Sequence, residues 1–429
     1  MRPTPEIKGW CPGAHRPMAS NDGLLIRAKI IGSRVTAAQL RAIAEIAADC
    51  GNGLVDLSQR AQLQIRGVSE STLAEALRRM DAQGLLAPDA EAERVTNIVA
   101  SPLAGLDAAA LFDANALAFE LAEAARRDAA LHALPAKFLF SVDDGGALSL
   151  ADVAADIRIE AHDVAKVALF VAGADDRAVL VDRPDAVATA LRMTRAFLAL
   201  RGDRAFELRR MRYVVAARGL EALLREAGLK AQPCERRSHP QLAAAFGAQQ
   251  THGVNYAGAA APFGRWRVDD LSTLAMLAID EGVGEIRLTS LRALLVPTPS
   301  RQAAQRVVDA AHARGLVTSA DDPRLAVVAC PGAPECPQAQ GETRNALALL
   351  APLAQKFAGI HGVGLHVSGC AKGCAHPGRA PVTLVANGGL FDLVENGDAS
   401  AAPRMAGLSI DDVERALTIR AKEQSCQTP

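Results

Sequence analysis

The sequence predicts an α+β protein that is internally duplicated, and three observations support this fold class. Apolar helices mix with hairpin-like pairs of strands, without the strict alternation that builds a parallel sheet. A helix–strand–helix pattern near the start of the chain returns in its second half. The length of 429 residues, 50% of them hydrophobic, is enough for several domains with a sizeable core.

A constant spacing identifies the duplicated unit. In the first copy, an apolar helix over 40–53 closes on a Gly-x-Gly turn, a strand begins at 54, and a second helix ends at 84. Each of these features returns 231 residues later, as shown by the pairs Gly53 and Gly284, Leu57 and Leu288, and Gly84 and Gly315 (284 − 53, 288 − 57 and 315 − 84). A fixed offset over three elements indicates a duplication rather than a chance likeness.

The same pattern divides the chain into segments. Each small α/β unit is followed by a larger α/β unit, and the stretch between the halves has no clear periodicity, which is typical of a connector. We expect an N-terminal segment with the first small unit over 1–88, the first larger unit over 89–230, the connector over 231–264, the second small unit over 265–320 and a last unit over 321–429.

The composition limits the kinds of molecule that the protein is expected to bind and the compartment in which it is expected to work. The net charge of −1 argues against a general binder of nucleic acid or of membrane surfaces. No run of 18 apolar residues occurs, and the first residues lack the apolar core of a signal peptide, so we expect a cytoplasmic protein. In that compartment, cysteines are thiols or metal ligands more often than disulfides.

Four cysteines in the second half have the spacing of a metal centre. Cys330 and Cys336 form a C-x5-C pair, and Cys370 and Cys374 form a C-x3-C pair, both in loops rich in Gly and Pro that follow apolar strands. Four thiolates suit an iron–sulfur cluster or zinc, and C-x5-C is long for a zinc knuckle. We therefore predict a [4Fe–4S] cluster, with zinc as the alternative. Lys372 would place a positive charge beside it. The other cysteines belong to no motif; they are Cys11, Cys50, Cys234 and Cys426.

At these residues the sequence resembles the sulfite and nitrite reductase family, a duplicated scaffold of ferredoxin-like halves and two larger domains. Three further stretches are similar to motifs of that family. Leu57-Ser-Gln-Arg60-Ala-Gln-Leu-Gln64 is similar to Thr-x-Arg-Gln-x-x-Gln, Asn97 to Gly105 is similar to an Asn-Pro-x-x-Gly turn, and Leu134-Pro-Ala-Lys137-Phe is similar to Leu-Pro-Arg-Lys-Phe-Lys. The resemblance covers nearly the whole chain. It implies that the small units are ferredoxin-like halves and that the last unit carries the cluster.

One departure changes the expected substrate. The family has a second active-site lysine two residues after the first, where this sequence has Leu139. Losing one of two cations weakens the case for reducing a small oxyanion. Three stretches instead resemble an oxygen-dependent member of the family that acts in aerobic cobalamin synthesis; they begin at Gly9, Glu285 and Ser368. This resemblance implies hydroxylation of precorrin-3A at C20 by O2, with γ-lactone formation from the ring-A acetate, and no sirohaem.

A tetrapyrrole that carries many carboxylates needs cations, and guanidinium groups bind carboxylates through two hydrogen bonds. Arg60 and Lys137 are the candidate catalytic residues. The candidate substrate-binding residues are Arg16, Arg27, Arg60, Gln64, Arg66 and Lys137. Arg60, Gln62, Gln64 and Arg66 should share one face of a strand. Arg287 and Arg292 are the second-half candidates.

Oxygen activation needs single electrons and a centre that binds O2. The resemblance implies a mononuclear non-haem iron, for which two His and one carboxylate are the usual ligands. His15 and His376 lie in distinctive motifs and are the candidates as iron ligands or substrate contacts; His252 and His366 are weaker ones. No Gly-x-Gly-x-x-Gly turn follows a strand, so an external reductase or ferredoxin, supplied ultimately by NADH, should deliver the electrons.

Two other readings stay open from the sequence. The first is a sirohaem-dependent sulfite or nitrite reductase, which the cysteine spacing fits equally well. The second is a non-catalytic electron-transfer or redox-sensing protein, although a carrier has little use for 429 residues and a duplicated scaffold.

Overall fold

The computed structural model describes residues 2–4, 6, 10–237, 242–345, 347–358 and 362–427, except for the side chains of 424–427. Gly9 of the first motif, residues 238–241 of the predicted connector and the side chain of Cys426 therefore lie outside the described residues. None of the helices in the described ranges has the length and apolarity that a bilayer-spanning segment needs.

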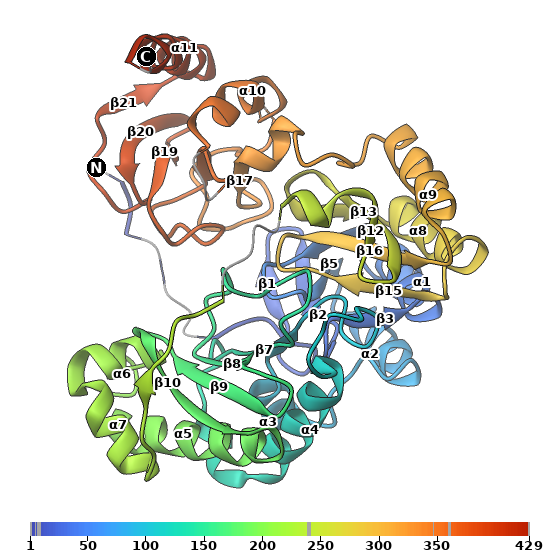
Figure 1. Ribbon diagram of the computed structural model, residues 1–429. Helices are drawn as coiled ribbons and strands as arrows, with labels where there is room; N and C mark the ends of the chain where they lie inside the picture. The colour runs from blue at the N-terminus through green and yellow to red at the C-terminus, as the bar shows by residue number, and fades with distance from the viewer. Residues whose placement is uncertain are drawn as a thin grey trace.

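The α+β prediction is confirmed, since helices and largely antiparallel sheets mix throughout the described ranges (Figure 1). Two antiparallel five-stranded sheets form the centre. In spatial order, the first contains β1 (Met18–Ser20), β2 (Gly23–Arg27), β5 (Leu63–Val68), β4 (Leu54–Leu57) and β14 (Arg265–Arg267). The second contains β12 (Gly247–Thr251), β13 (Val254–Ala260), β16 (Ala293–Thr298), β15 (Glu285–Leu288) and β3 (Arg34–Thr36).

The two central sheets exchange their edge strands. β14 belongs to the second half of the chain but pairs with β4 of the first half, with Trp266 opposite Val55. In the same way β3 of the first half pairs with β15, with Val35 opposite Ile286. The 231-residue offset relates β3 to β14 (265 − 34) and β4 to β15 (285 − 54), so the duplication read from the sequence is a structural one. The exchange ties the two halves together through backbone hydrogen bonds.

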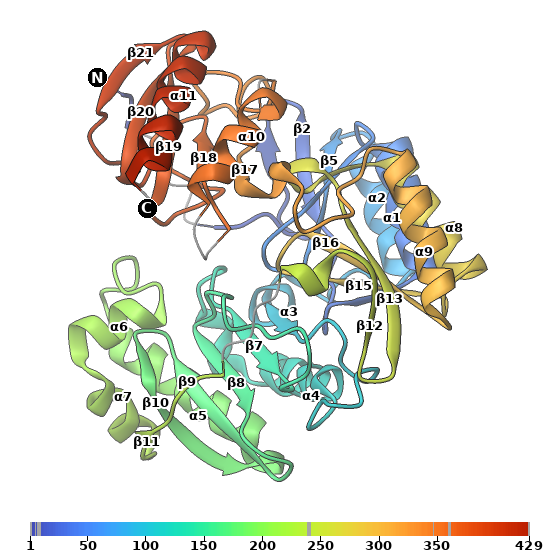
Figure 2. The same ribbon diagram turned by 45° about the horizontal axis from the view of Figure 1, so that its top comes forward.

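Four helices cover the outer side of these sheets, namely α1 (Ala37–Cys50), α2 (Leu73–Ala82), α8 (Val268–Asp280) and α9 (Arg301–Ala313). Thr36 caps α1, because its side chain accepts from the backbone of Gln39 and the Gln39 side chain accepts in return. The apolar faces of α1 and α8 pack against each other, and both views show the four helices together on one side (Figures 1 and 2).

The larger units have the same topology as each other. In each, three parallel strands are followed by antiparallel ones. The first sheet is β6 (Ile98–Ala100), β7 (Phe140–Asp143), β8 (Ile157–Ala161), β9 (Lys166–Val171), β10 (Ala174–Asp182) and β11 (Gln232–Pro233). The second is β17 (Val327–Ala329), β18 (Leu365–Ser368), β19 (Ala380–Asn387), β20 (Leu390–Gly397) and β21 (Met405–Leu408).

Helices pack on these two sheets. Those of the first are α3 (Ala90–Val95), α4 (Ala114–Arg127), α5 (Ala186–Arg201), α6 (Met211–Arg218) and α7 (Leu220–Ala227); those of the second are α10 (Leu347–Phe357) and α11 (Ile410–Gln427). The 3₁₀ turns are η1 (Ala129–Ala133), η2 (Arg183–Asp185), η3 (Ala243–Ala245), η4 (Pro262–Gly264) and η5 (Pro323–Ala326).

The segment 231–264, which we expected to be an irregular connector, contains more regular structure than predicted. Much of 231–264 is ordered as β11, β12 and β13. β13 is rich in small residues, so it lacks the large alternating side chains that mark a strand in sequence. The small residues are needed, because a Cβ at Gly258 would lie 2.1 Å from the main-chain oxygen of Ala245.

Candidate functional site

Two cysteine loops leave neighbouring parallel strands at the same edge of the last sheet. Cys330 directly follows β17, and Cys370 follows β18 after Gly369. Because the carboxyl ends of parallel strands meet at one edge, the loops are brought together. The amide of Gly369 donates to Cys330 Sγ at 3.1 Å, and the amide of Cys330 donates to the oxygen of Val367 at 3.2 Å. The backbone thus holds the first ligand candidate against the second loop.

The four thiols lie within electrostatic reach of one another. Burial raises the pKa of Cys330, and the neighbouring Cys336 and Cys370 raise it further. Burial also raises the pKa of Cys374, where Cys330 and Cys370 act in the same direction while Lys372 opposes them. Cys330, Cys336 and Cys370 are partly exposed and Cys374 is exposed, and four thiols on two adjoining loops are the donors that an iron–sulfur cluster uses. The donor set suits an iron–sulfur cluster, and the assignment of these four cysteines as its ligands stays a prediction.

A mononuclear iron would need a different arrangement of the same residue types, with three side chains around one ion. Within the described ranges, no three His, Cys, Asp or Glu side chains lie close enough together to hold one metal ion. His15 Nε2 contacts the oxygen of Ala87 at 2.5 Å, whereas His376 Nε2 lies 3.2 Å from the oxygen of Arg379. The residues described here therefore do not form the three-ligand site that a mononuclear iron would need. The weaker candidates, His252 and His366, lie against Asp107 and the ring of His376.

The predicted cations of the first half fall into two groups. Arg60 lies in the turn before β5, and its Nη2 donates to the main-chain oxygen of Lys137 at 3.0 Å. Arg27 on β2 is the cross-strand partner of Gln64 on β5. Arg27 Nε and Arg60 Nη1 are buried and have no hydrogen-bond partner among the described residues. Both guanidinium groups lie near Cys11, which raises the pKa of each.

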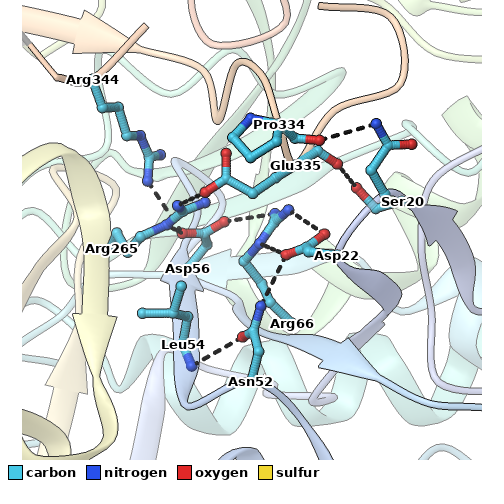
Figure 3. A network of polar contacts seen from close by, with 11 residues as sticks. Ser20, Asp22, Asn52, Leu54, Asp56, Arg66, Arg265, Pro334, Glu335 and Arg344 are labelled. Atoms are coloured by element: carbon cyan, nitrogen blue, oxygen red, sulfur yellow. Dashed lines mark hydrogen bonds and ion pairs between the residues drawn. The ribbon is translucent and has the colours of Figure 1, made fainter. Parts of the chain in front are cut away.

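Arg66 belongs to a different environment. Its guanidinium binds Asp22 through two hydrogen bonds of 2.9 Å and Asp56 through one of 3.0 Å (Figure 3). Asp56 is the cross-strand partner of Gln64, so Arg66 lies on the same face of β5 as Gln64. The register shifts only beyond Arg66, at Gly67, whose φ is 71°. Its role as a substrate contact stays a prediction, with three of its N–H groups already paired.

The other predicted residues are dispersed. The guanidinium of Arg16 lies 4.5 Å above the ring of Trp10 and is exposed. Arg287 is buried and donates to Glu285 and to the oxygen of Ala104. Arg292 is half-buried near Asp56, and burial lowers the pKa of Arg292.

Lys137 links the cations to the cysteines. Its backbone oxygen accepts from Arg60, and its ammonium group lowers the pKa of Cys374, although burial raises that pKa overall. Lys372, between two of the cysteines, lies near Cys370 and Cys374 and donates to the oxygen of Glu6 at 3.1 Å. The candidate cluster and the candidate substrate cations therefore adjoin one another.

Leu139, which stands where the family has a second lysine, does not face the cations. Its side chain is buried in the core of the central sheets, and its amide donates to Asp156 at 3.0 Å. Asp156 also binds the guanidinium of Arg210 at 2.9 Å. This carboxylate thus fixes the chain that follows Lys137.

Sequence reasoning missed Lys29. Its ammonium group donates to the oxygen of Glu93 at 2.9 Å and lies 3.5 Å from Asn97 Oδ1. Burial, reinforced by Arg27 and Arg60, lowers the pKa of Lys29 to about 7. The signal that could have found it is its spacing, because residues two apart on an extended chain point the same way, and Lys29 follows Arg27 at that spacing.

We call Arg27, Lys29, Arg60 and Lys137 the cation wall. Glu93 raises the pKa of two of its members, Arg27 and Lys29, and so opposes the effect of burial on both. Three charged side chains and a lysine whose pKa is about 7, with two buried donors unpartnered among the described residues, suit a ligand that carries more than one negative charge.

Comparisons with known proteins agree with this architecture. Residues 16–83 match the nitrite/sulfite reductase ferredoxin-like half domain, and residues 91–233 match the nitrite and sulphite reductase 4Fe-4S domain. The second match covers the first larger unit, which contains no cysteine; the four cysteines lie in the second.

Individual relatives extend over most of the chain. A precorrin-3B synthase of Sinorhizobium sp is 30% identical over 92% of this chain and 84% of its own length. A ferredoxin–nitrite reductase of Synechococcus elongatus is 28% identical over 84% of this chain and 76% of its own. The structure of the NirA protein of Mycobacterium tuberculosis has a TM-score of 0.70 at 20% identity, covering 93% of this chain and 81% of that one.

Proposed function

The chain belongs to the nitrite and sulfite reductase family of oxidoreductases, and from that premise we propose that it acts as a precorrin-3B synthase. The proposed reaction hydroxylates precorrin-3A at C20 and closes the ring-A acetate into a γ-lactone. One atom of O2 enters the macrocycle and the other leaves as water, with two electrons and two protons taken up.

The cation wall is the observation that carries the proposal. Precorrin-3A has many acetate and propionate groups, and each carboxylate can accept two hydrogen bonds from one guanidinium. The unpartnered Arg27 Nε and Arg60 Nη1 would gain partners from such a ligand. Because an unpaired buried donor costs about 1–3 kcal/mol, hydrogen bonds from these two donors would favour binding of a polycarboxylate.

The electron path is proposed from the position of Lys137. A [4Fe–4S] cluster bound by Cys330, Cys336, Cys370 and Cys374 would supply electrons one at a time. Lys137 lies near Cys374 and holds Arg60 through its main chain, so electrons would enter next to the bound substrate. An external donor, a ferredoxin or a reductase fed by NADH, would reduce the cluster. Mononuclear iron has no three-residue ligand set among the described residues.

Lys29 supports the proton part of the proposed reaction. A group with a pKa of about 7 can both hold and release a proton at neutral pH. Its hydrogen bond to Glu93 and its place beside Arg27 and Arg60 would set it against a substrate carboxylate. We infer that Lys29 adjusts the charge of the wall to that of the ligand.

A sirohaem-dependent nitrite reductase is the second candidate, favoured by the relatives of that name. The buried Leu139 speaks against it, since only one lysine of the expected pair is present. The visible spectrum of anaerobically purified protein separates the two. A sirohaem band would sink the synthase proposal, and an iron–sulfur spectrum without haem would sink the reductase.

Turnover is the direct test. Precorrin-3A, O2 and a reductant should yield the hydroxylated lactone in proportion to the cluster content of the protein. Binding without product under every donor would favour the third reading, a redox sensor or carrier. Nitrite reduction at a comparable rate would favour the reductase.

A further inference from the structure

The loop between the first two cysteines is tied to the sheet of the other half of the chain. Glu335 precedes Cys336, and its carboxylate accepts from Arg265 Nη1 at 2.6 Å (Figure 3). Its main-chain oxygen accepts from the amide of Asn21 at 2.9 Å and from Ser20 Oγ at 2.5 Å. The side chain of Asn21 donates to the oxygen of Pro334 at 3.0 Å. The loop therefore contacts the β1–β2 hairpin and β14 at once.

Arg265 connects Glu335 to the row of side chains that leads to the cation wall. It lies on the exchanged strand β14 and donates from Nε to Asp56 at 3.0 Å. Asp56 is the cross-strand partner of both Arg265 and Gln64, and Gln64 is the partner of Arg27. A single row of side chains thus crosses the sheet from the Cys330–Cys336 loop to the wall.

The charges in this network balance. Three guanidinium groups, those of Arg66, Arg265 and Arg344, surround the carboxylates of Asp22, Asp56 and Glu335 (Figure 3). The side chains of Arg265 and Glu335 are 13% and 20% exposed, so solvent screens their pairing only partly. Arg344 lies within electrostatic reach of Cys330. Loss of one carboxylate would leave an excess positive charge next to the cluster ligands.

We propose that Glu335 is a positioning residue which, through Arg265, fixes the Cys330–Cys336 loop against the first central sheet and sets the reduction potential of the cluster held there. The proposal uses the iron–sulfur part of the proposed function and is independent of its tetrapyrrole substrate. Extra positive charge stabilises the reduced, more negative cluster, so removal of the Glu335 charge should raise the potential.

The first test compares Glu335→Gln with Glu281→Gln, the matched loss of a paired carboxylate on the far helices, where Glu281 binds Arg306. The midpoint potential of the cluster is measured by an EPR-monitored titration, and its loss in air by the visible absorbance. We expect Glu335→Gln to raise the potential and to speed cluster loss about tenfold, the factor that corresponds to about 1.4 kcal/mol. Glu281→Gln should change neither. An unchanged potential and rate in Glu335→Gln would overturn the proposal.

A mutant cycle tests whether Glu335 acts through Arg265. Adding Glu335→Gln to Arg265→Gln should change the rate of cluster loss by less than about twofold, because the partner is already gone. If the two effects multiply, Glu335 acts by another route and the proposal fails.

Far-UV circular dichroism establishes that each variant folds. Should Glu335→Gln fail to fold, Glu335→Asp, which keeps the charge, must hold the potential near that of the wild type. Wild-type protein without any cluster would overturn this inference and the proposed function together, whereas a cluster with an unmoved potential overturns this inference alone.

Discussion

Arg60 Nη2 donates to the main-chain oxygen of Lys137 at 3.0 Å, across 77 residues of sequence. This bond joins the first central sheet to the first larger unit and leaves Arg60 Nη1 buried without a partner among the described residues. Burial lowers the pKa of Arg60 to about 10, so the group is still charged at neutral pH. A charged donor held in place by one hydrogen bond, with another donor free, is preorganised for an anionic ligand.

Replacement of Arg60 by Ala should weaken substrate binding more than it slows turnover at saturation. A charge-assisted hydrogen bond contributes about 1.5–3 kcal/mol, so we expect the apparent affinity to fall by roughly 10- to 100-fold. Steady-state kinetics with precorrin-3A, or titration with a tetrapyrrole polycarboxylate, measures this change.

The matched control for this substitution is Arg78→Ala. Arg78 lies on the exposed face of α2 and is paired only with Glu75 among the contacts described. It should leave the affinity unchanged. An Arg60→Ala protein with the affinity of the wild type would count against a carboxylate role for the wall.

Lys29 should make the stability of the protein depend on pH. Burial lowers its pKa in the folded state from 10.5 to about 7. Between these values the unfolded chain binds a proton that the folded chain does not, so the free energy of unfolding rises with pH from about 7 to about 10. In Lys29→Met this rise should be reduced, as seen in thermal unfolding at several pH values.

The control for Lys29 is an exposed lysine whose pKa shifts the other way. Lys166 pairs with Asp182, and the hydrogen bond between them raises the pKa of Lys166. Lys166→Met should therefore keep the rise in stability between pH 7 and 10. If Lys29→Met and the wild type gave parallel curves, the low pKa of Lys29 would be refuted.

The sequence predicted the duplication but not the exchange of strands. The 231-residue offset is visible because helices of similar length end on glycines at matched positions. β3 and β14 are only three residues long, and their partners lie in the other half of the chain. Local periodicity carries no information about such a distant partner, because pairing depends on tertiary packing.

The candidate site likewise combines residues that local motifs reveal with contacts that only the fold creates. Arg27, Arg60 and Lys137 stand in motifs or strands that the sequence displays. The structure brings Arg27 near Arg60, and Lys137 near both Arg60 and Cys374. The partners of Arg66 and Glu335 could not be predicted, because each is fixed by ion pairs across segments that only the fold brings together. Alternation predicted Arg66 on the face of Gln64, and the structure agrees, since Arg66 binds Asp56, the cross-strand partner of Gln64.

Cys370→Ser should lose the cluster and the activity together. A serine hydroxyl is a poor replacement for a thiolate, and one missing ligand exposes the cluster to oxidation. Iron and sulfide analysis, with the visible spectrum, measures the loss. Cys234→Ser, which changes a cysteine outside both loops, should retain both, and a Cys370→Ser protein with a full cluster would refute the assignment.

Trp266 offers a test of the strand exchange itself. It lies on β14, is fully buried, and packs in the core shared by both central sheets. Because it sits opposite Val55 of the first half, its side chain fills space between elements from the two halves. Trp266→Ala should lower the free energy of unfolding by about 3–5 kcal/mol, through lost burial and a cavity that strands joined by hydrogen bonds cannot close. Urea unfolding should give this loss in one cooperative transition of the central sheets. A loss below about 1 kcal/mol would show that β14 contributes little to the joining of the two halves.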